Sequence, residues 1–226
     1  MLPLRDNVPT RSRPLVTYAL IVTNVLVWVL YELPNLERAV NELAYHPCEV
    51  ENSCVQVGQD WPVTAITSMF MHGDWLHLLG NMLFLWIFGN NVEDAMGRLR
   101  FLVFYLLAGL AATGLQTAIT LGSSSDIAGQ IPNLGASGAI SGVLGAYLLL
   151  LPRARVLTVI FFVLREIPAW IFLGVYFLLQ LYDANFQLRH PPEGGGVAVF
   201  AHVGGFVFGM LTVYLFRTRG PLRPAY

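Results

Sequence analysis

Long apolar stretches dominate the chain and alternate with shorter polar segments. A helix needs roughly 20 predominantly apolar residues to cross a bilayer core of about 30 Å. Six stretches have this length or can be extended to it, and they are residues 15–33, 76–92, 101–121, 134–151, 169–182 and 197–216. We expect the acidic pair Glu93 and Asp94 to close the second stretch. The pattern predicts an all-α polytopic membrane protein with a bundle of six transmembrane helices.

The same pattern divides the chain into three parts. Residues 1–14 form an N-terminal segment, residues 15–216 form the membrane domain, and residues 217–226 form a C-terminal tail. A long polar loop, residues 34–75, follows the first span. One more apolar run, residues 156–164, has nine residues and would reach only about 14 Å as a helix. Arginines flank this run, so we expect it to lie at the membrane interface rather than to cross the bilayer.

Composition agrees with a membrane protein. Apolar residues make up 55% of the chain and charged residues only 12%, whereas about a quarter of the residues in a soluble domain are charged. The net charge of −1 excludes the basic surface that a nucleic-acid partner requires, and the high hydrophobicity excludes a disordered chain. The bilayer is therefore the first partner that the sequence predicts.

The basic residues, all 13 of them arginines, test the proposed topology. Cytoplasmic loops of membrane proteins carry an excess of arginine and lysine. With the N-terminus in the cytoplasm, Arg38 and Arg189 fall outside and the other 11 arginines fall in cytoplasmic segments. No small-residue cleavage site follows the first apolar run, so we expect an uncleaved span rather than a signal peptide. The predicted location is the cell (plasma or inner) membrane, with both termini cytoplasmic.

Polar residues cluster at one end of three spans in this topology. The second, fourth and sixth spans enter from the outer face, and each carries polar residues near that entrance: His77 and Asn81, Ser137, and His202. Such groups are costly inside a membrane and usually line a cavity or a functional site. His77 and Asn81 are four residues apart, so they share one helical face.

Small residues accompany the same positions. Gly205 and Gly209 follow His202 on one face of the sixth span, and Gly135 and Gly138 flank the serine of the fourth. Small residues at this spacing let transmembrane helices approach closely. If the fourth and sixth spans pack there, the serine hydroxyl and the imidazole come within hydrogen-bond reach.

That arrangement has a chemical use. A serine hydroxyl is a weak nucleophile until an adjacent imidazole takes its proton. The side chains of Asn81 and His77, and the Ser137 N–H at a helix start, can donate hydrogen bonds to an oxyanion. Taken alone, a Gly-x-Ser-Gly segment is more often a packing motif, and a lone membrane His or Asn often joins helices. The shared end of the three spans favours a catalytic cluster.

The two cysteines permit one bridge at most. Cys48 and Cys54 lie outside in the predicted topology, where a disulfide is favoured if the compartment is oxidising. Two free thiols are the alternative. A metal site that adds His46 is less favoured, and we expect neither a metal nor another cofactor.

Taken together, the motifs resemble the rhomboid intramembrane serine proteases. The matching residues, in order along the six predicted helices, are His72-x4-His77-x3-Asn81, Gly135-Ala-Ser137-Gly138 and Ala201-His202-x2-Gly205-x3-Gly209. The resemblance implies a dyad of Ser137 as nucleophile and His202 as general base, with Asn81 and His77 at the oxyanion site. It also implies transmembrane protein substrates, namely single-span proteins cut in or near the outer part of their membrane segment. Helix five and the loop before helix six, with Gly194–Gly196 as a hinge, would form the gate of an outward-opening cavity through which water reaches the dyad.

Two positions depart from the family pattern. Many relatives carry an aromatic residue four positions after the nucleophile, which stacks on the histidine, and this chain has Ser141 there. The first loop often carries Trp-Arg, and this chain has Trp61 followed by Pro62. The alternative function is a catalytically inactive rhomboid-like protein that binds transmembrane clients, although both dyad residues are present. A channel or transporter would call for charged mid-span residues or an internal repeat, and neither is found.

Overall fold

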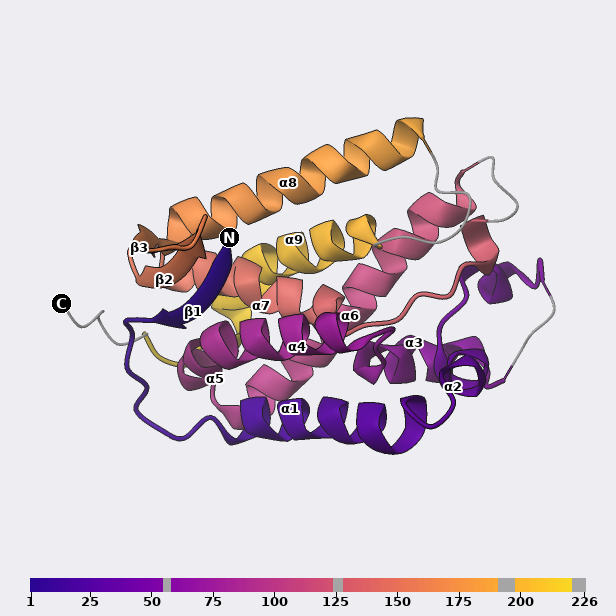
Figure 1. The fold of residues 1–226 in the computed structure, drawn as a ribbon, viewed down its shortest axis with the longest axis horizontal. Coiled ribbons are helices and arrows are strands. Elements are labelled where there is room, and N and C mark those ends of the chain that lie inside the picture. Colours follow the sequence, from indigo (N-terminus) through magenta and orange to yellow (C-terminus); the bar gives the residue numbers. More distant parts are fainter. Residues whose placement is uncertain (55–57, 124–127, 191–197, 221–226) are drawn as a thin grey trace.

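The computed structural model describes residues 1–54, 58–123, 128–190 and 198–220, and its body is a bundle of six helical segments (Figure 1). Their bounds are α1 (Leu15–Val27) with the π-helical turn Trp28–Glu32, α4 (Trp75–Phe84) continuing through the π-helical turn Leu85–Gly89 into α5 (Asn90–Met96), α6 (Arg98–Leu121), α7 (Ser137–Leu150), α8 (Ala169–Arg189) and α9 (Val199–Phe216). Each segment coincides with a predicted span. The predicted helical membrane bundle is thereby confirmed.

The ends of the spans differ from the prediction by a few residues. Helix α8 continues beyond residue 182 to Arg189, and α7 begins only at Ser137. By length and apolar composition, three helical stretches in the described part of the chain can cross a membrane: Leu15–Glu32, Arg98–Leu121 and Val199–Phe216. The predicted hinge Gly194–Gly196 lies outside the described residues.

Helix α7 lies in the middle of the bundle and packs against α6 and α9. It is buried without interruption from Gly138 to Tyr147, as a helix that is apolar on all sides must be. A Cβ atom added to Gly205 of α9 would lie 2.0 Å from the carbonyl oxygen of Gly138, and one added to Gly209 would lie 2.0 Å from that of Gly142. Residues without side chains therefore set the separation of α7 and α9.

The acidic pair that was predicted to close the second span lies inside helix α5 instead, and both residues are buried. The carboxylate of Glu93 accepts hydrogen bonds from the backbone N–H groups of Val16 and Thr17, at 3.1 and 2.7 Å. Asp94 pairs with Arg11 at 2.9 Å. The first N–H groups of a helix have no partner within it, so Glu93 satisfies two such groups of α1 and holds α1 to α5.

The long first loop contains local structure that the sequence analysis did not predict. Its elements are α2 (Leu36–Leu43), the 3-10 turn Pro47–Glu51, α3 (Trp61–Thr67) and the 3-10 turn Ser68–Phe70. Cys48 and Cys54 form a disulfide within it. Pro62 lies in the first turn of α3, where its missing N–H is tolerated. Tyr45 exchanges two backbone hydrogen bonds with Asn133, which joins the loop to the segment before α7.

A three-stranded antiparallel sheet closes the bundle beside the start of α8 (Figure 1). It consists of β1 (Leu2–Asp6), β2 (Arg155–Ile160) and β3 (Val163–Pro168) in that order. The run 156–164 is therefore part of a β-hairpin, in agreement with its β-branched composition, and the N-terminal segment adds an unpredicted strand. Asp6 ties the sheet to α7, because its Oδ2 accepts hydrogen bonds from Tyr147 and Asn91 at 2.5 and 2.7 Å. Burial raises the pKa of Asp6 to about 6.

Candidate active site

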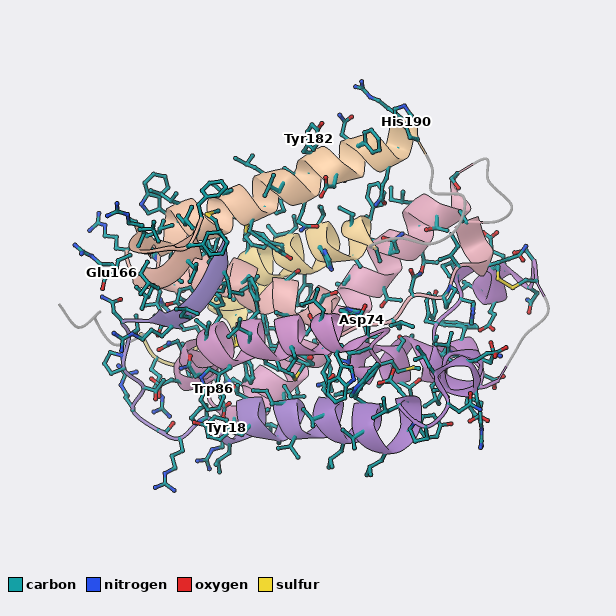
Figure 2. The ribbon with its side chains drawn as sticks, viewed as in Figure 1. Tyr18, Asp74, Trp86, Glu166, Tyr182 and His190 are labelled. Atoms are coloured by element: carbon teal, nitrogen blue, oxygen red, sulfur yellow. A yellow bond between two sulfur atoms is a disulfide. The ribbon has the colours of Figure 1, made fainter. Side chains whose placement is uncertain are left out.

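The predicted polar residues lie in the first two turns of α4, α7 and α9, whose N-terminal ends point away from the sheet (Figure 1). His77 is in the first turn of α4, Ser137 is the first residue of α7, and His202 is in the first turn of α9. Asp74 precedes α4 (Figure 2), and its carboxylate accepts a hydrogen bond from the His77 N–H at 2.8 Å. This N-cap fixes where α4 begins and so positions His77.

The structure brings the serine and one histidine into contact. Ser137 Oγ and His202 Nε2 are 2.7 Å apart. Gly205 lies one turn after His202 in α9 and rests against the backbone of Gly138. The backbone N–H of Ala201 also donates to Gln116 Oε1 of α6 at 3.2 Å. The close packing of three helices therefore places the hydroxyl and the imidazole within hydrogen-bond distance.

A second contact holds the other side of the imidazole. His202 Nδ1 lies 3.0 Å from Gln180 Oε1 of α8. One turn earlier on α8, the hydroxyl of Tyr176 lies 2.9 Å from Ser141 Oγ. Ser141 therefore joins α7 to α8, and Gln180, one turn further along α8, contacts the ring of His202.

Gln180 was missed by the sequence analysis, although a signal existed. It is a polar residue inside the fifth apolar stretch, and strongly polar side chains in spans usually face a cavity or a partner. Residues 176 and 180 are four apart, so Tyr176 and Gln180 share the face of α8 that points toward the pair. Spacing alone did not indicate which helix packs beside α9.

Asn81 and His77 provide hydrogen-bond donors next to the serine. Asn81 is buried, and its Nδ2 has no hydrogen-bond partner among the described residues. His77 Nδ1 accepts a hydrogen bond from the Gly73 N–H at 3.4 Å, so the ring proton is on Nε2. Gly135 has a φ of +129°, and a Cβ atom there would lie 2.8 Å from His77 Nε2. Only glycine both adopts this backbone and leaves room for the ring.

These groups line one cavity of about 490 Å³. Its polar lining residues include Asn81, Ser137 and His202, whereas Phe84 of α4 and Tyr176 of α8 belong to its apolar lining. Binding cavities commonly combine apolar walls with a few convergent polar groups. The cavity lies between α4 and α8, and Ser137 of α7 is one of its lining residues.

His72 is not among the residues that line the cavity, and it contacts His77 rather than the serine. Its ring packs edge-on against the His77 ring at 5.0 Å between centroids, and its backbone N–H donates to Glu32 Oε1 at 2.7 Å. Burial lowers the pKa of His72 to about 3. His72 is therefore a neutral packing partner of His77, held to the end of the first span.

Together these features define a polytopic membrane protein in which a Ser–His pair sits at the ends of packed helices. The sequence matches the Rhomboid domain over residues 59–219, which include α3 to α9 and all the residues around the cavity. The chain belongs to the rhomboid family.

Several relatives show how far the similarity extends. The chain is 29% identical over 194 residues to Rhomboid protein 1, mitochondrial, of Saccharomyces cerevisiae, covering 86% of this chain and 51% of that protein. It is 35% identical over 137 residues to Rhomboid protease GluP of Bacillus subtilis, covering 61% of this chain and 25% of that protein. It is 29% identical over 142 residues to Presenilin-associated rhomboid-like protein, mitochondrial, of Bos taurus, covering 63% of this chain and 34% of that protein. The chain thus spans about half or less of the length of these relatives.

Proposed function

We propose that this chain is an intramembrane serine endopeptidase, in which Ser137 is the nucleophile and His202 the general base. The contact of 2.7 Å between Ser137 Oγ and His202 Nε2 in the cavity carries the proposal. His202 takes the hydroxyl proton as Oγ attacks the scissile carbonyl carbon, and it returns the proton to the leaving amine when the C–N bond breaks. Water, activated by the same imidazole, then releases the acyl group from Ser137.

The tetrahedral intermediate carries a negative charge on its oxygen, and three donors lie near the serine to stabilise it. Asn81 Nδ2 has no hydrogen-bond partner in the described part of the chain, His77 carries its proton on Nε2, and the backbone N–H of Ser137 is the first of helix α7. Donors that are already oriented lower the barrier, because no reorganisation is needed when charge develops.

In the proposed mechanism Gln180 is a positioning residue. With the proton on Nδ1, His202 donates to Gln180 Oε1 at 3.0 Å and leaves Nε2 free to accept the serine proton. Such a partner selects the catalytic tautomer and fixes the ring. This contact takes over the orienting role that a stacked aromatic residue plays in many relatives, since Ser141 occupies that position here.

The proposed substrates are single-span membrane proteins. The apolar cavity wall between α4 and α8 suits an apolar peptide, and the dyad at the helix ends would meet the outer part of a bound transmembrane segment. The name of the Bacillus subtilis relative describes a rhomboid protease, which supports peptide-bond hydrolysis here.

Labelling and cleavage test the proposal together. In lipid vesicles, a serine-directed fluorophosphonate should label the wild type, and the wild type should cut a single-span reporter with a helix-destabilising residue. Ser137→Ala should abolish both reactions. Ser141→Ala is the matched control, because its hydroxyl contacts Tyr176 instead of His202, and it should still be labelled. A wild type that binds the reporter but is never labelled and never cuts would point to the inactive relative instead.

We also propose that both termini face the cytoplasm and that the membrane is the cell membrane. The arginine distribution supports this orientation, and the disulfide of the first loop suits an oxidising space on the opposite side. The names of the yeast and bovine relatives assign those proteins to mitochondria. Reporter fusions at both ends test the orientation, and an external C-terminus would contradict it.

A further inference from the structure

The tip of the β2–β3 hairpin exposes two phenylalanine rings. Ile160 pairs with Val163, so Phe161 and Phe162 alone form the connecting loop. Their exposed fractions are 92% and 100%, and their φ angles are +46° and +69°. Two large apolar side chains thus project from the end of the sheet without any contact that shields them from water.

Local turn preferences do not explain these residues. A two-residue hairpin loop with positive φ at both positions has the geometry that favours Asn-Gly or Gly-Gly. A positive φ in a bulky residue such as phenylalanine is a conformational outlier. Phe161 and Phe162 are therefore unfavourable in this turn on two counts, backbone conformation and exposure to water, and transfer of the rings to an apolar phase would offset the second cost.

The sheet is apolar near the tip and charged near its base. The strand register places Leu2, Val159 and Leu164 side by side on one face, and Leu2 and Leu164 are 51% and 58% exposed. Toward the base of the hairpin, Arg155 pairs with Glu166 at 3.4 Å. Figure 2 shows Glu166 at the sheet end of the molecule. This gradient matches the change from lipid chains to headgroups across one leaflet.

The sheet is also continuous with the lipid-facing surface of the bundle. Strand β3 ends at Pro168, and α8 begins at the next residue, Ala169. Trp170, in the first turn of α8, is 56% exposed, and exposed tryptophans gather at the level of the headgroups. Arg153 precedes the hairpin and Arg165 lies in β3 opposite Thr158, and both carry charges that attract anionic headgroups.

We propose that the hairpin is a membrane anchor whose tip, Phe161 and Phe162, inserts into the leaflet at the sheet end of the bundle. Arg153 and Arg165 bind phosphate groups of anionic lipids. This anchor holds the connection between α7 and α8 at a constant depth, and thereby the start of the helix that carries Gln180. The proposal concerns the surface alone and does not depend on catalysis.

A single introduced cysteine tests the depth of the tip in the full-length protein. Both native cysteines are joined in the disulfide, so a polarity-sensitive fluorophore will attach only to the new thiol of Phe162→Cys. The matched control is Glu166→Cys on the same hairpin, which is exposed near the base. Both proteins are reconstituted in phosphatidylcholine–phosphatidylglycerol vesicles.

The expected result is a blue-shifted emission for the tip label, with quenching by brominated lipid chains and protection from aqueous iodide, whereas the Glu166 label remains open to iodide. Equal iodide quenching at both positions would overturn the proposal. Protection that grows with the protein-to-lipid ratio, without quenching by brominated lipid, would also overturn it, because a second copy of the chain would then cover the tip.

A second variant separates insertion from folding. Replacing the loop by F161N and F162G supplies the residues that this turn geometry prefers, so the hairpin should persist. A label on Val163→Cys should then move from the lipid phase to water when these two changes are added. A label that stays lipid-protected in the Asn-Gly variant would show that the phenylalanines do not anchor the hairpin.

Discussion

Gly205→Ala should separate the Ser–His pair by a known mechanism. The added Cβ atom would lie 2.0 Å from the Gly138 carbonyl oxygen, and an ordinary contact begins at 3.4 Å. Relief of this clash requires α7 and α9 to move apart by about 1.4 Å. Ser137 Oγ and His202 Nε2 lie across the same interface at 2.7 Å, so the same movement would stretch their distance beyond hydrogen-bonding range.

The expected losses of stability and of labelling rate follow from these distances. Overpacking of a tight interface costs about 1–3 kcal/mol of stability. General-base assistance is typically worth about 100-fold or more in rate, so the fluorophosphonate labelling rate of Ser137 should fall by about that factor. Thermal unfolding should also occur at a lower temperature, by about 2–4 °C for each kcal/mol lost.

Gly114→Ala is the matched control, because Gly114 lies in α6 and nothing is within 4 Å of an added Cβ atom there. Its stability should change by less than about 1 kcal/mol, and its labelling rate should equal that of the wild type. The assay compares labelling rates and melting curves of both variants in the same vesicles. A folded Gly205→Ala protein that is labelled at the wild-type rate would refute the idea that glycine packing sets the Ser–His distance.

Two further variants test other contacts. Gln180→Leu removes the acceptor for His202 Nδ1, so kcat for reporter cleavage should fall about tenfold while KM stays constant, as expected for loss of about 1.4 kcal/mol. Gln180→Glu keeps an acceptor and should restore the rate. An equal loss of kcat in both variants would exclude the positioning role. Asp6 has a pKa raised from 3.8 to about 6 by burial, so its contribution to stability is full below pH 3.8 and is lost as the pH rises through 6. The free energy of unfolding of the wild type, measured from pH 4 to 7, should decline by about 3 kcal/mol, and this decline should be absent in Asp6→Asn. Identical pH profiles of the two proteins would contradict the raised pKa of Asp6.

The membrane bundle was predictable because one physical requirement governs it. A span must be long and apolar, and this property is local to the sequence, so all six segments were located. Glu93 and Asp94 were misplaced for a tertiary reason. Their charges suggested the end of a span, but the N-terminal segment supplies Arg11 as a partner for Asp94, and the start of α1 supplies free N–H groups for Glu93. Buried charges become acceptable when such partners are present.

The sheet illustrates the opposite case. The run 156–164 was too short to span, and that conclusion needed only its length. Its β-hairpin is also supported by β1, which lies more than a hundred residues away and contributes Leu2 opposite Val159, because a two-stranded hairpin alone is marginally stable. Short apolar runs are ambiguous between helix and strand, and the distant pairing decides between them.

For the candidate site, the sequence alone indicated Ser137, His202, His77 and Asn81, because polar residues in apolar spans stand out and topology assigned them to one end. It also indicated where the glycines lie. Only the tertiary structure brought α8 beside α9, so that Gln180 contacts His202, and only it shaped the cavity that Asn81 lines. The physical reason is that the cost of a polar or apolar residue in a membrane is a property of each residue, whereas hydrogen-bond distances depend on which helices pack together and how closely.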